Sequence, residues 1–263
     1  DIIVVARRRA ENILTVPLSV TAFSESQLIK AGAYDLGGIQ GAVPNLNIVQ
    51  GRGSATSANI TIRGIGQPDA LQTFDPAVGV YVDGVYMSRI QGAMFSMMDV
   101  AQVEVLRGPQ GTLYGKNTIG GAIKYISRGL RSDFNGFGSL TIGNYGQRDI
   151  KAAVGGGLGG SEYLRGRISI ADLHNDGFGE NILTGDPVSD KDVTAYRLSL
   201  GAYVTDNFDL QFALDHMKDG SGVRGAQMLQ ANRNVPNTPP LESRYDVRNG
   251  MPNVNETTMS GAS

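Results

Sequence analysis

The chain has 263 residues and a formal net charge of −2, from 23 basic and 25 acidic residues, and no basic face indicates a nucleic-acid partner. The absence of cysteine excludes a disulfide framework and a thiolate metal site. The 36 glycines are about twice the usual share of ~7%.

The first six residues, Asp1-Ile-Ile-Val-Val-Ala6, form a short β-prone run that is followed by three arginines. A flexible extended segment with β-branched residues can add as a strand to an exposed sheet edge of a partner, where main-chain hydrogen bonds supply affinity. The run suits either that use or the first strand of the domain that follows.

Residues 11 to about 128 mix short strands with one or two helical stretches, which predicts a small α+β domain. A helix is expected over residues 24–30, because Ser24 and Gln27 have the spacing of a capping box. Gly32 is a suitable residue to end it. Further strands are expected over residues 20–23, 46–49, 59–63 and 78–83.

The segment from Val103 to Ile126 predicts a strand, a glycine-rich crossing and a second strand. Val103 and Val105 alternate with charged or polar positions, and an extended apolar run restarts at Ala122. Five glycines fall within fourteen residues of this segment. Glycine at that density indicates backbone packed where side chains cannot fit.

From about Ser132 the hydrophobic period becomes two, which predicts long β-strands. In residues 196–204 every second residue is apolar, whereas residues 197, 199 and 201 are Arg, Ser and Gly. Residues 164–170 and 208–215 repeat this pattern. Segments of about 9 to 15 residues exceed the usual ~5 to 6 of a globular strand but suit the ~9 to 11 that cross a bilayer at a tilt.

The connections between these strands alternate in length. Residues 155–161 and 205–207 are tight, whereas residues 181–192 and 220–257 are long and polar. Short turns at one rim and long loops at the other are typical of outer-membrane barrels, although a soluble sandwich or jelly roll also alternates. About five strands and the start of a sixth cannot close a barrel of at least ~8 strands. We therefore expect the natural protein to continue well beyond Ser263.

The segment from Val103 to Ile126 resembles the plug-domain signature of TonB-dependent outer-membrane receptors, VEV-x-RGP followed by LYG-x-x-x-x-GG-x-I. The resemblance implies a coupling segment over residues 1–9 and an α+β plug domain over residues 10–130. Residues 131–263 are then the first five to six strands, with extracellular loops, of a large antiparallel transmembrane β-barrel of about 22 strands. The matching residues are Arg107-Gly108-Pro109, Leu113-Tyr114-Gly115 and Gly120-Gly121.

The N-terminal run resembles the TonB box of the same family, a short hydrophobic segment in which an acidic residue is followed by Ile or Val, Val and Ala at fixed spacing. The resemblance implies that the partner is TonB, which transmits force from the inner-membrane proton gradient with ExbB and ExbD. The implied TonB-binding residues are Asp1, Ile2, Ile3, Val4, Val5 and Ala6.

Arg63 and Arg107 match positions at which the family keeps two plug arginines facing barrel glutamates. A guanidinium buried at a wet interface needs a carboxylate, which its planar fork can bind with two hydrogen bonds. Such pairs would fasten the plug to the barrel. The acids are expected in the absent part of the barrel, and Glu104 is the local candidate. A solvated surface arginine is the alternative at each position.

Three plug loops are expected to point outward, over residues 50–56, 67–74 and 88–95, and in the resembling family such apices contact the substrate. They supply a cation, amides, a carboxylate and an aromatic face, which suits a polar ligand with some apolar surface. Ordinary solvation is the alternative for each side chain. The candidate substrate-binding residues are Arg52, Gln67, Asp69, Phe74, Arg89 and Gln91.

The residue spacing does not match the enzymatic motifs that the sequence partly resembles. The loop from Gly111 to Asn117 is one residue shorter than a phosphate-binding loop, and Asn117 replaces the required Ser or Thr. His174 and His216 have no partner at metal-ligand spacing. We therefore expect no catalytic residue, metal or cofactor.

The resemblance implies TonB-dependent active transport across the outer membrane of a Gram-negative bacterium, with the N-terminus in the periplasm. The expected cargo is a ferric siderophore or a similar iron complex, and the alternatives are an oligosaccharide, cobalamin or haem. The rival classes are a passive porin-like or adhesive barrel and a soluble β-rich enzyme or binding domain. The expected partners are TonB, outer-membrane lipid and a small-molecule or metal-chelate ligand.

Overall fold

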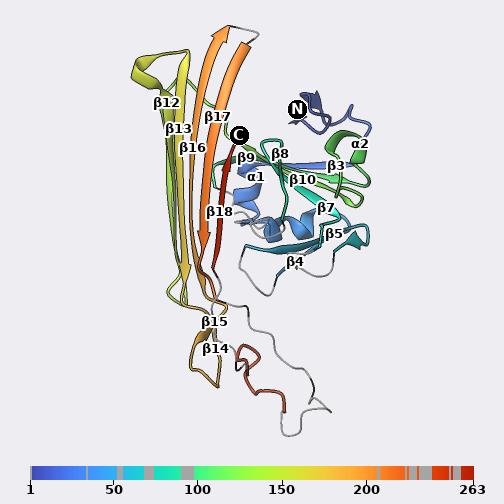
Figure 1. Ribbon diagram of the computed structural model, residues 1–263, viewed down its shortest axis with the longest axis vertical. Coiled ribbons are helices and arrows are strands. Elements are labelled where there is room, and N and C mark those ends of the chain that lie inside the picture. The colour runs from blue at the N-terminus through green and yellow to red at the C-terminus, as the bar shows by residue number, and fades with distance from the viewer. Residues whose placement is uncertain are drawn as a thin grey trace.

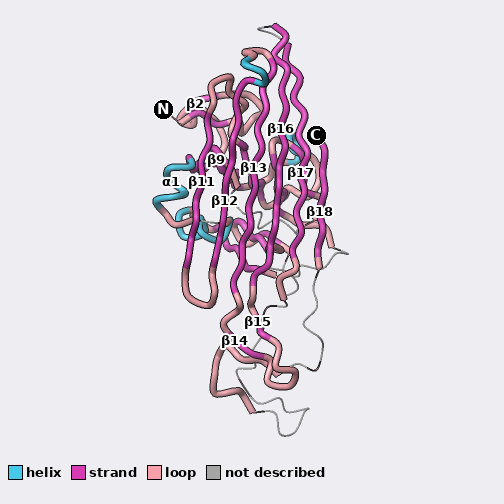
Figure 2. Tube along the Cα trace, turned by 90° about the vertical axis from the view of Figure 1, so that its left-hand side faces the viewer, coloured by secondary structure: helices cyan, strands magenta, loops and turns pink. Residues whose placement is uncertain are grey.

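A mixed α+β domain lies beside a tall antiparallel sheet (Figure 1). The computed structural model describes residues 2–33, 35–51, 56–67, 74–89, 98–205, 208–222, 224, 230, 239–248, 250 and 256–263. The N-terminal domain packs against one face of the tall sheet, and the other face carries no second layer in the described part of the chain (Figure 2).

The core of the N-terminal domain is a five-stranded sheet in the order β3-β9-β10-β7-β8. β10 pairs antiparallel with β9 and parallel with β7. The predicted strand, crossing and strand are confirmed, and they supply the middle of this sheet. The strands are β3 (Val20–Ser24), β7 (Val78–Val82), β8 (Val85–Met87), β9 (Val100–Arg107) and β10 (Gly121–Ser127).

Close packing accounts for two of the five glycines of this segment, Gly120 and Gly121. The crossing contains the one-turn helix α2 (Gly111–Tyr114). A β-carbon at Gly120 would lie 2.8 Å from the Ile65 carbonyl oxygen, and one at Gly121 would collide with the Leu106 carbonyl oxygen. At these two glycines backbone passes where no side chain fits, as predicted, whereas a β-carbon at Gly111 or Gly115 would meet open space.

The remaining elements complete the N-terminal domain. The predicted helix is confirmed, because the Ser24 N–H donates to Gln27 Oε1 at 2.9 Å at its start and Gly32 follows its end with φ +62°. The elements are β1 (Ile3–Val4), β2 (Glu11–Asn12), α1 (Glu25–Lys30), η1 (Leu36–Ala42), β4 (Leu46–Gln50), β5 (Ala58–Ile62) and β6 (Ile65–Gly66).

The tall sheet is antiparallel, with strands in the order β11-β12-β13-β16-β17-β18. It is open, because β11 and β18 are its edges. The predicted long strands are confirmed. They are β11 (Asn135–Ile142), β12 (Arg148–Gly157), β13 (Leu164–Asn175), β16 (Lys191–Thr205), β17 (Phe208–Asp219) and β18 (Thr257–Ala262).

Short and long connections alternate along the tall sheet, as predicted. The short turn η2 (Leu158–Gly160) joins β12 to β13 at the upper end in Figure 1. The long connection between β13 and β16 lies at the lower end and contains β14 (Gly179–Glu180) and β15 (Pro187–Val188). We call these the short-turn end and the long-loop end.

The two faces of the tall sheet differ as the period of two predicts. Leu200 of β16 and Leu210 of β17 point away from the N-terminal domain and remain 37% and 59% exposed. Arg197 of β16 points to the opposite face and binds Asp83 of the N-terminal domain. The sheet therefore has one exposed apolar face and one face that contacts the domain. No helix in the described ranges is long and apolar enough to span a membrane.

One hydrophobic cluster runs from the N-terminal domain into the tall sheet. It includes Leu36 and Ile39 of η1, both almost fully buried. Burial of apolar surface stabilises by roughly 25 cal/mol per Å², so this contact favours the docked arrangement. The members from the tall sheet are Ala171, Leu173, Val193, Ala195 and Met217.

Buried arginines of the tall sheet bind aspartates of the N-terminal domain. Arg167 of β13 binds both carboxylate oxygens of Asp99, with Nη2 2.6 Å from Oδ1. Ser169 Oγ donates to the same carboxylate at 2.7 Å. Arg197 of β16 binds Asp83. Because Asp99, Arg167 and Arg197 are each at most 8% exposed, these charges depend on their partners.

The pair between Asp99 and Arg167 should contribute strongly to stability. Asp99→Asn leaves the Arg167 guanidinium buried without a carboxylate, which is expected to cost about 3–5 kcal/mol. The free energy of unfolding of the purified full-length protein in detergent micelles, from guanidinium titration followed by near-ultraviolet circular dichroism, measures this loss.

The matched control is Asp133→Asn, which breaks the exposed ion pair between Arg131 and Asp133 (2.8 Å). Solvent screens that pair, so we expect no measurable change. Equal effects of the two substitutions would contradict the importance of the buried pair.

Candidate functional site: the docked N-terminal segment

The N-terminal segment, residues 2–6, lies against the central sheet of the N-terminal domain. Ile3 and Val4 form β1, which pairs antiparallel with β2. Val4 and Ala6 are fully buried in a hydrophobic cluster with Tyr114, whereas Ile3 is 50% exposed. Alternate side chains thus face the domain, as they do in a strand.

Side chains of β9, β10 and α2 hold the backbone of this segment. Glu104 Oε1 accepts a hydrogen bond from the Val5 N–H at 2.6 Å. Lys124 Nζ donates to the Val5 carbonyl oxygen at 2.6 Å. Tyr114 Oη donates to the Ala6 carbonyl oxygen, also at 2.6 Å. The polar contacts to the segment are therefore made to its main chain.

Glu104 and Lys124 form a buried ion pair beneath the segment, with Nζ 3.0 Å from Oε2 and side-chain exposures of 0% and 6%. They are directly opposite on β9 and β10. Burial lowers the pKa of Lys124, and the Glu104 carboxylate opposes that shift. Burial raises the pKa of Tyr114 to about 12, so its hydroxyl stays protonated at neutral pH and can donate to the segment.

The arginines that follow the segment are tied to the domain as well. Arg7 binds Glu11, and Arg9 Nη2 lies 3.0 Å from the same carboxylate. Hydrogen bonds from Arg7 and then Arg9 lower the pKa of Glu11 to about 2, so this carboxylate is ionised at neutral pH. The Arg8 guanidinium lies over the Tyr114 ring, 5.5 Å from its centroid.

The residues expected to bind TonB are all placed except Asp1, which lies outside the described residues. The segment is extended at Ile3 and Val4. Its binding to TonB stays a prediction. The structure adds that Val5 has both main-chain groups bonded within the domain. The segment must therefore leave the domain before this residue can pair with a partner's strand.

The expectation that Glu104 is a local partner for the plug arginines is wrong. Its Oε1 accepts hydrogen bonds from Val5 and from Gln102 Nε2 (3.1 Å), and its Oε2 binds Lys124. The physical reason is strand alternation. Arg107 is three residues from Glu104 on β9, so the two side chains start on opposite faces.

Arg63 and Arg107 form no ion pair with any carboxylate in the described part of the chain. Arg63 lies in the turn between β5 and β6 at φ +54°. Its Nη1 is 3.3 Å from the position that a β-carbon on Gly108 would take, so it reaches the residue next to Arg107. Arg107 Nε is buried without a hydrogen-bond partner among the described atoms. Their fastening role stays a prediction.

In the observed ion pairs between the N-terminal domain and the tall sheet, the acid and the base are on the opposite sides from those expected. The acids, Asp83 and Asp99, belong to the N-terminal domain, and the arginines, Arg167 and Arg197, belong to the tall sheet. The signal in the sequence is an arginine on the polar or small-residue face of an alternating strand. Asp83, the partner of Arg197, is 114 residues away along the chain. Sequence spacing therefore cannot identify the pair.

Three of the six candidate substrate residues, Gln67, Phe74 and Arg89, lie in the described part of the chain. Phe74 is 46% exposed. Gln67, Phe74 and Arg89 form no hydrogen bond or ring contact with one another. Substrate binding by these residues stays a prediction. The candidates that lie outside the described residues are Arg52, Asp69 and Gln91.

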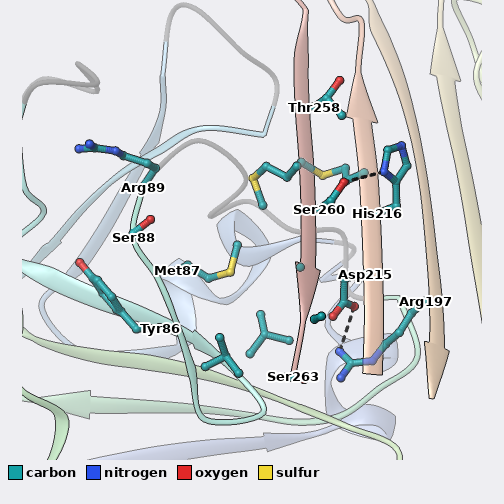
Figure 3. A pocket seen from close by; sticks show the side chains of 16 residues that line it. Tyr86, Met87, Ser88, Arg89, Arg197, Asp215, His216, Thr258, Ser260 and Ser263 are labelled. Atoms are coloured by element: carbon teal, nitrogen blue, oxygen red, sulfur yellow. Dashed lines mark hydrogen bonds and ion pairs between the residues drawn. The ribbon is translucent and has the colours of Figure 1, made fainter. Parts of the chain in front are cut away.

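Two cavities separate the N-terminal domain from parts of the tall sheet. The larger, of about 410 Å³, lies between β8 and strands β17 and β18. Figure 3 shows Met87 on the domain side of it and the pair of Arg197 with Asp215, 3.4 Å apart, on the sheet side. The Arg89 side chain points away from β18 in the same view. The second cavity, of about 310 Å³, lies between α1 and strands β11 and β12.

Residues 12–122 match the family model of the TonB-dependent Receptor Plug Domain. The pesticin receptor of Yersinia pestis is 37% identical over 111 residues, which are 42% of this chain and 16% of that protein. The vitamin B12 transporter BtuB of Vibrio vulnificus is 29% identical over 178 residues, which cover 63% of this chain and 28% of that protein.

Solved structures of receptors share this architecture. The ferric yersiniabactin uptake receptor FyuA from Yersinia pestis matches with a TM-score of 0.71 and 27% identity, over 78% of this chain and 32% of its own. The ferripyoverdine receptor of Pseudomonas aeruginosa matches with a TM-score of 0.76 over 99% of this chain and 33% of its own, and at 18% identity it shows the fold alone. The chain thus spans a third or less of these proteins. Residues 12–122 match a TonB-dependent receptor plug domain, and the fold is similar to that of such a domain joined to part of a barrel sheet.

Proposed function

We propose that this protein is a TonB-dependent transporter of the outer membrane of a Gram-negative bacterium. The observation that carries the proposal is the N-terminal segment, which is bound by its backbone to the middle of the plug sheet. A pull on the segment would act directly on β9 through Glu104 and on β10 through Lys124. The segment is therefore well placed to transmit force to the plug.

The proposed cargo is a ferric siderophore or a similar iron complex. Support comes from the names of relatives, which include FyuA and the ferrioxamine B receptor of Salmonella typhimurium, 33% identical over 94 residues. Cobalamin is the second candidate, because BtuB matches 63% of this chain. The compared proteins are transporters and receptors, and the proposed role needs no covalent step.

The proposed cycle begins when cargo binds at the long-loop end, which faces the outside of the cell. The N-terminal segment then leaves the plug sheet and enters the periplasm. TonB, energised through ExbB and ExbD, adds to the extended segment and pulls it. The plug rearranges or partly unfolds to open a path. Mechanical work replaces nucleotide hydrolysis, because the outer membrane has no ATP.

The unpaired plug arginines fit this cycle. We propose that Arg107 binds a carboxylate on a further barrel strand, because its buried Nε has no hydrogen-bond partner among the described atoms and needs an acceptor. Arg63 is exposed here and reaches Gly108 beside Arg107, and its proposed carboxylate partner rests on the family resemblance. Such pairs at an interface can exchange for water when the plug moves.

Deletion of residues 1–6 from the full-length protein should abolish uptake and leave cargo binding intact, because TonB loses its attachment point. Uptake and binding are measured in whole cells with labelled cargo. The cargo is radioiron in hydroxamate, catecholate and pyoverdine-type complexes, and labelled cyanocobalamin. The control is Leu14→Ser, at an 87% exposed position outside the segment, which should transport normally.

Uptake that persists after the deletion would favour a passive pore over active transport. Uptake of cyanocobalamin alone by the unmodified protein would replace the iron complex as cargo and leave the mechanism in place.

The exposed apolar face of the tall sheet should contact lipid. Leu200 lies near the middle of the apolar stripe of β16, so Leu200→Arg is expected to cost about 2–4 kcal/mol in the membrane, whereas Val204→Arg near the strand end should cost about 0–1 kcal/mol. The amount of folded protein in isolated outer membranes measures the difference. Equal amounts for the two variants would contradict the proposed membrane face.

A further inference from the structure

The sheet surface beneath the N-terminal segment carries charges that apolar packing does not require. Val4 and Ala6 could be buried against apolar side chains alone. Instead, Glu104 is fully buried and Lys124 is 6% exposed in its side chain; Glu104 accepts a hydrogen bond from the Val5 N–H, and Lys124 donates one to the Val5 carbonyl oxygen. A buried ion pair is unfavourable unless its geometry and its further hydrogen bonds are well matched. The main chain of Val5 supplies those further bonds.

We propose that Glu104, Lys124 and Tyr114 form a clamp that holds the coupling segment by its peptide backbone and sets how readily the segment is released to TonB. This inference rests on the proposed function of the segment as the TonB-binding element. The clamp engages the N–H and the carbonyl oxygen of Val5 and the carbonyl oxygen of Ala6.

The clamp begins where strand pairing of the segment ends. β1 pairs with β2 only through Ile3 and Val4. At Val5, one carboxylate and one ammonium group take the donor and the acceptor that a neighbouring strand would otherwise pair. Because these groups bind the main chain, the identity of the side chain at this position has little influence on the hold.

The clamp and TonB exclude each other at Val5. Strand addition uses the same N–H and carbonyl groups that the clamp occupies. Hydrogen bonds to ionised groups are roughly twice as strong as those between neutral groups, so the docked segment is the resting state. Loss of one clamp bond should therefore shift the segment toward the released state before any pull.

The clamp can be tested from the side of the segment in the full-length receptor, in detergent micelles and without TonB or cargo. A nitroxide label on a cysteine at Ile3, a half-exposed position, reports mobility by electron paramagnetic resonance. Val5→Pro removes the N–H that Glu104 accepts and leaves the plug sheet unchanged. We expect the ratio of mobile to immobile label to rise about ten- to a hundredfold, as for loss of a hydrogen bond to a charged group.

Val5→Ala keeps both main-chain groups and is the matched control, so its label should remain immobile. An immobile label in Val5→Pro, or equal mobility in Val5→Pro and Val5→Ala, would overturn the clamp in favour of side-chain packing.

The same label mobility can be measured after a substitution in the plug sheet instead of in the N-terminal segment. Glu104→Leu removes the acceptor of the Val5 N–H and should mobilise the label, whereas Glu11→Leu should not, because among the described residues Glu11 binds the side chains of Arg7 and Arg9. Protease resistance of the plug identifies variants that have folded, and a folded Glu104→Leu with an immobile label also overturns the clamp. Since no TonB or cargo is present, this result is independent of the uptake experiment on the proposed function.

Discussion

The pairing of β9 with β10 is the constraint on which the other parts of this structure depend. Side chains alternate along each strand, so the pair presents two different faces. Val105 and Ile123 point into the hydrophobic cluster that continues into the tall sheet. Glu104 and Lys124 point to the other face and bind the N-terminal segment. One pair of strands thereby links the docked N-terminal segment to the contact with the tall sheet.

Residues at the ends of the same two strands take part in the buried ion pairs and hydrogen bonds that connect the domain to the tall sheet. Asp99 directly precedes β9 and binds Arg167. Ser127, the last residue of β10, donates its hydroxyl to Asp83 at 2.6 Å, and Asp83 in turn binds Arg197. Displacing β9 or β10 would strain these ties, and a buried charge that loses its partner is costly. The N-terminal domain is therefore held in one position by charge as well as by apolar packing, and any displacement of β9 or β10 would work against both.

Much of the fold follows from local patterns. The period of two in residues 196–204 and 208–215 predicts strands with one apolar face, because alternation in a strand is a property of the backbone. Ser24 and Gln27 predict the start of α1, since a capping box needs only residues within one turn. The glycines between β9 and β10 predict close backbone approach, although the carbonyl groups they approach, on β6 and β9, could not be named from the sequence.

The site depended on distant partners and could be predicted only in part. The β-prone run at the N-terminus, the arginines on the polar or small-residue faces of alternating strands and the buried positions of β9 are visible in the amino-acid order, because each is a matter of composition and period. The amino-acid sequence does not determine which acidic side chain pairs with which basic one. Glu104 lies next to Arg107 on one strand and yet binds Lys124 and Val5, 20 and 99 residues away. The tertiary structure determines these partners. Strand pairing brings together charges that are far apart along the chain, and the alternation of side chains between the two faces separates charges that are close along it.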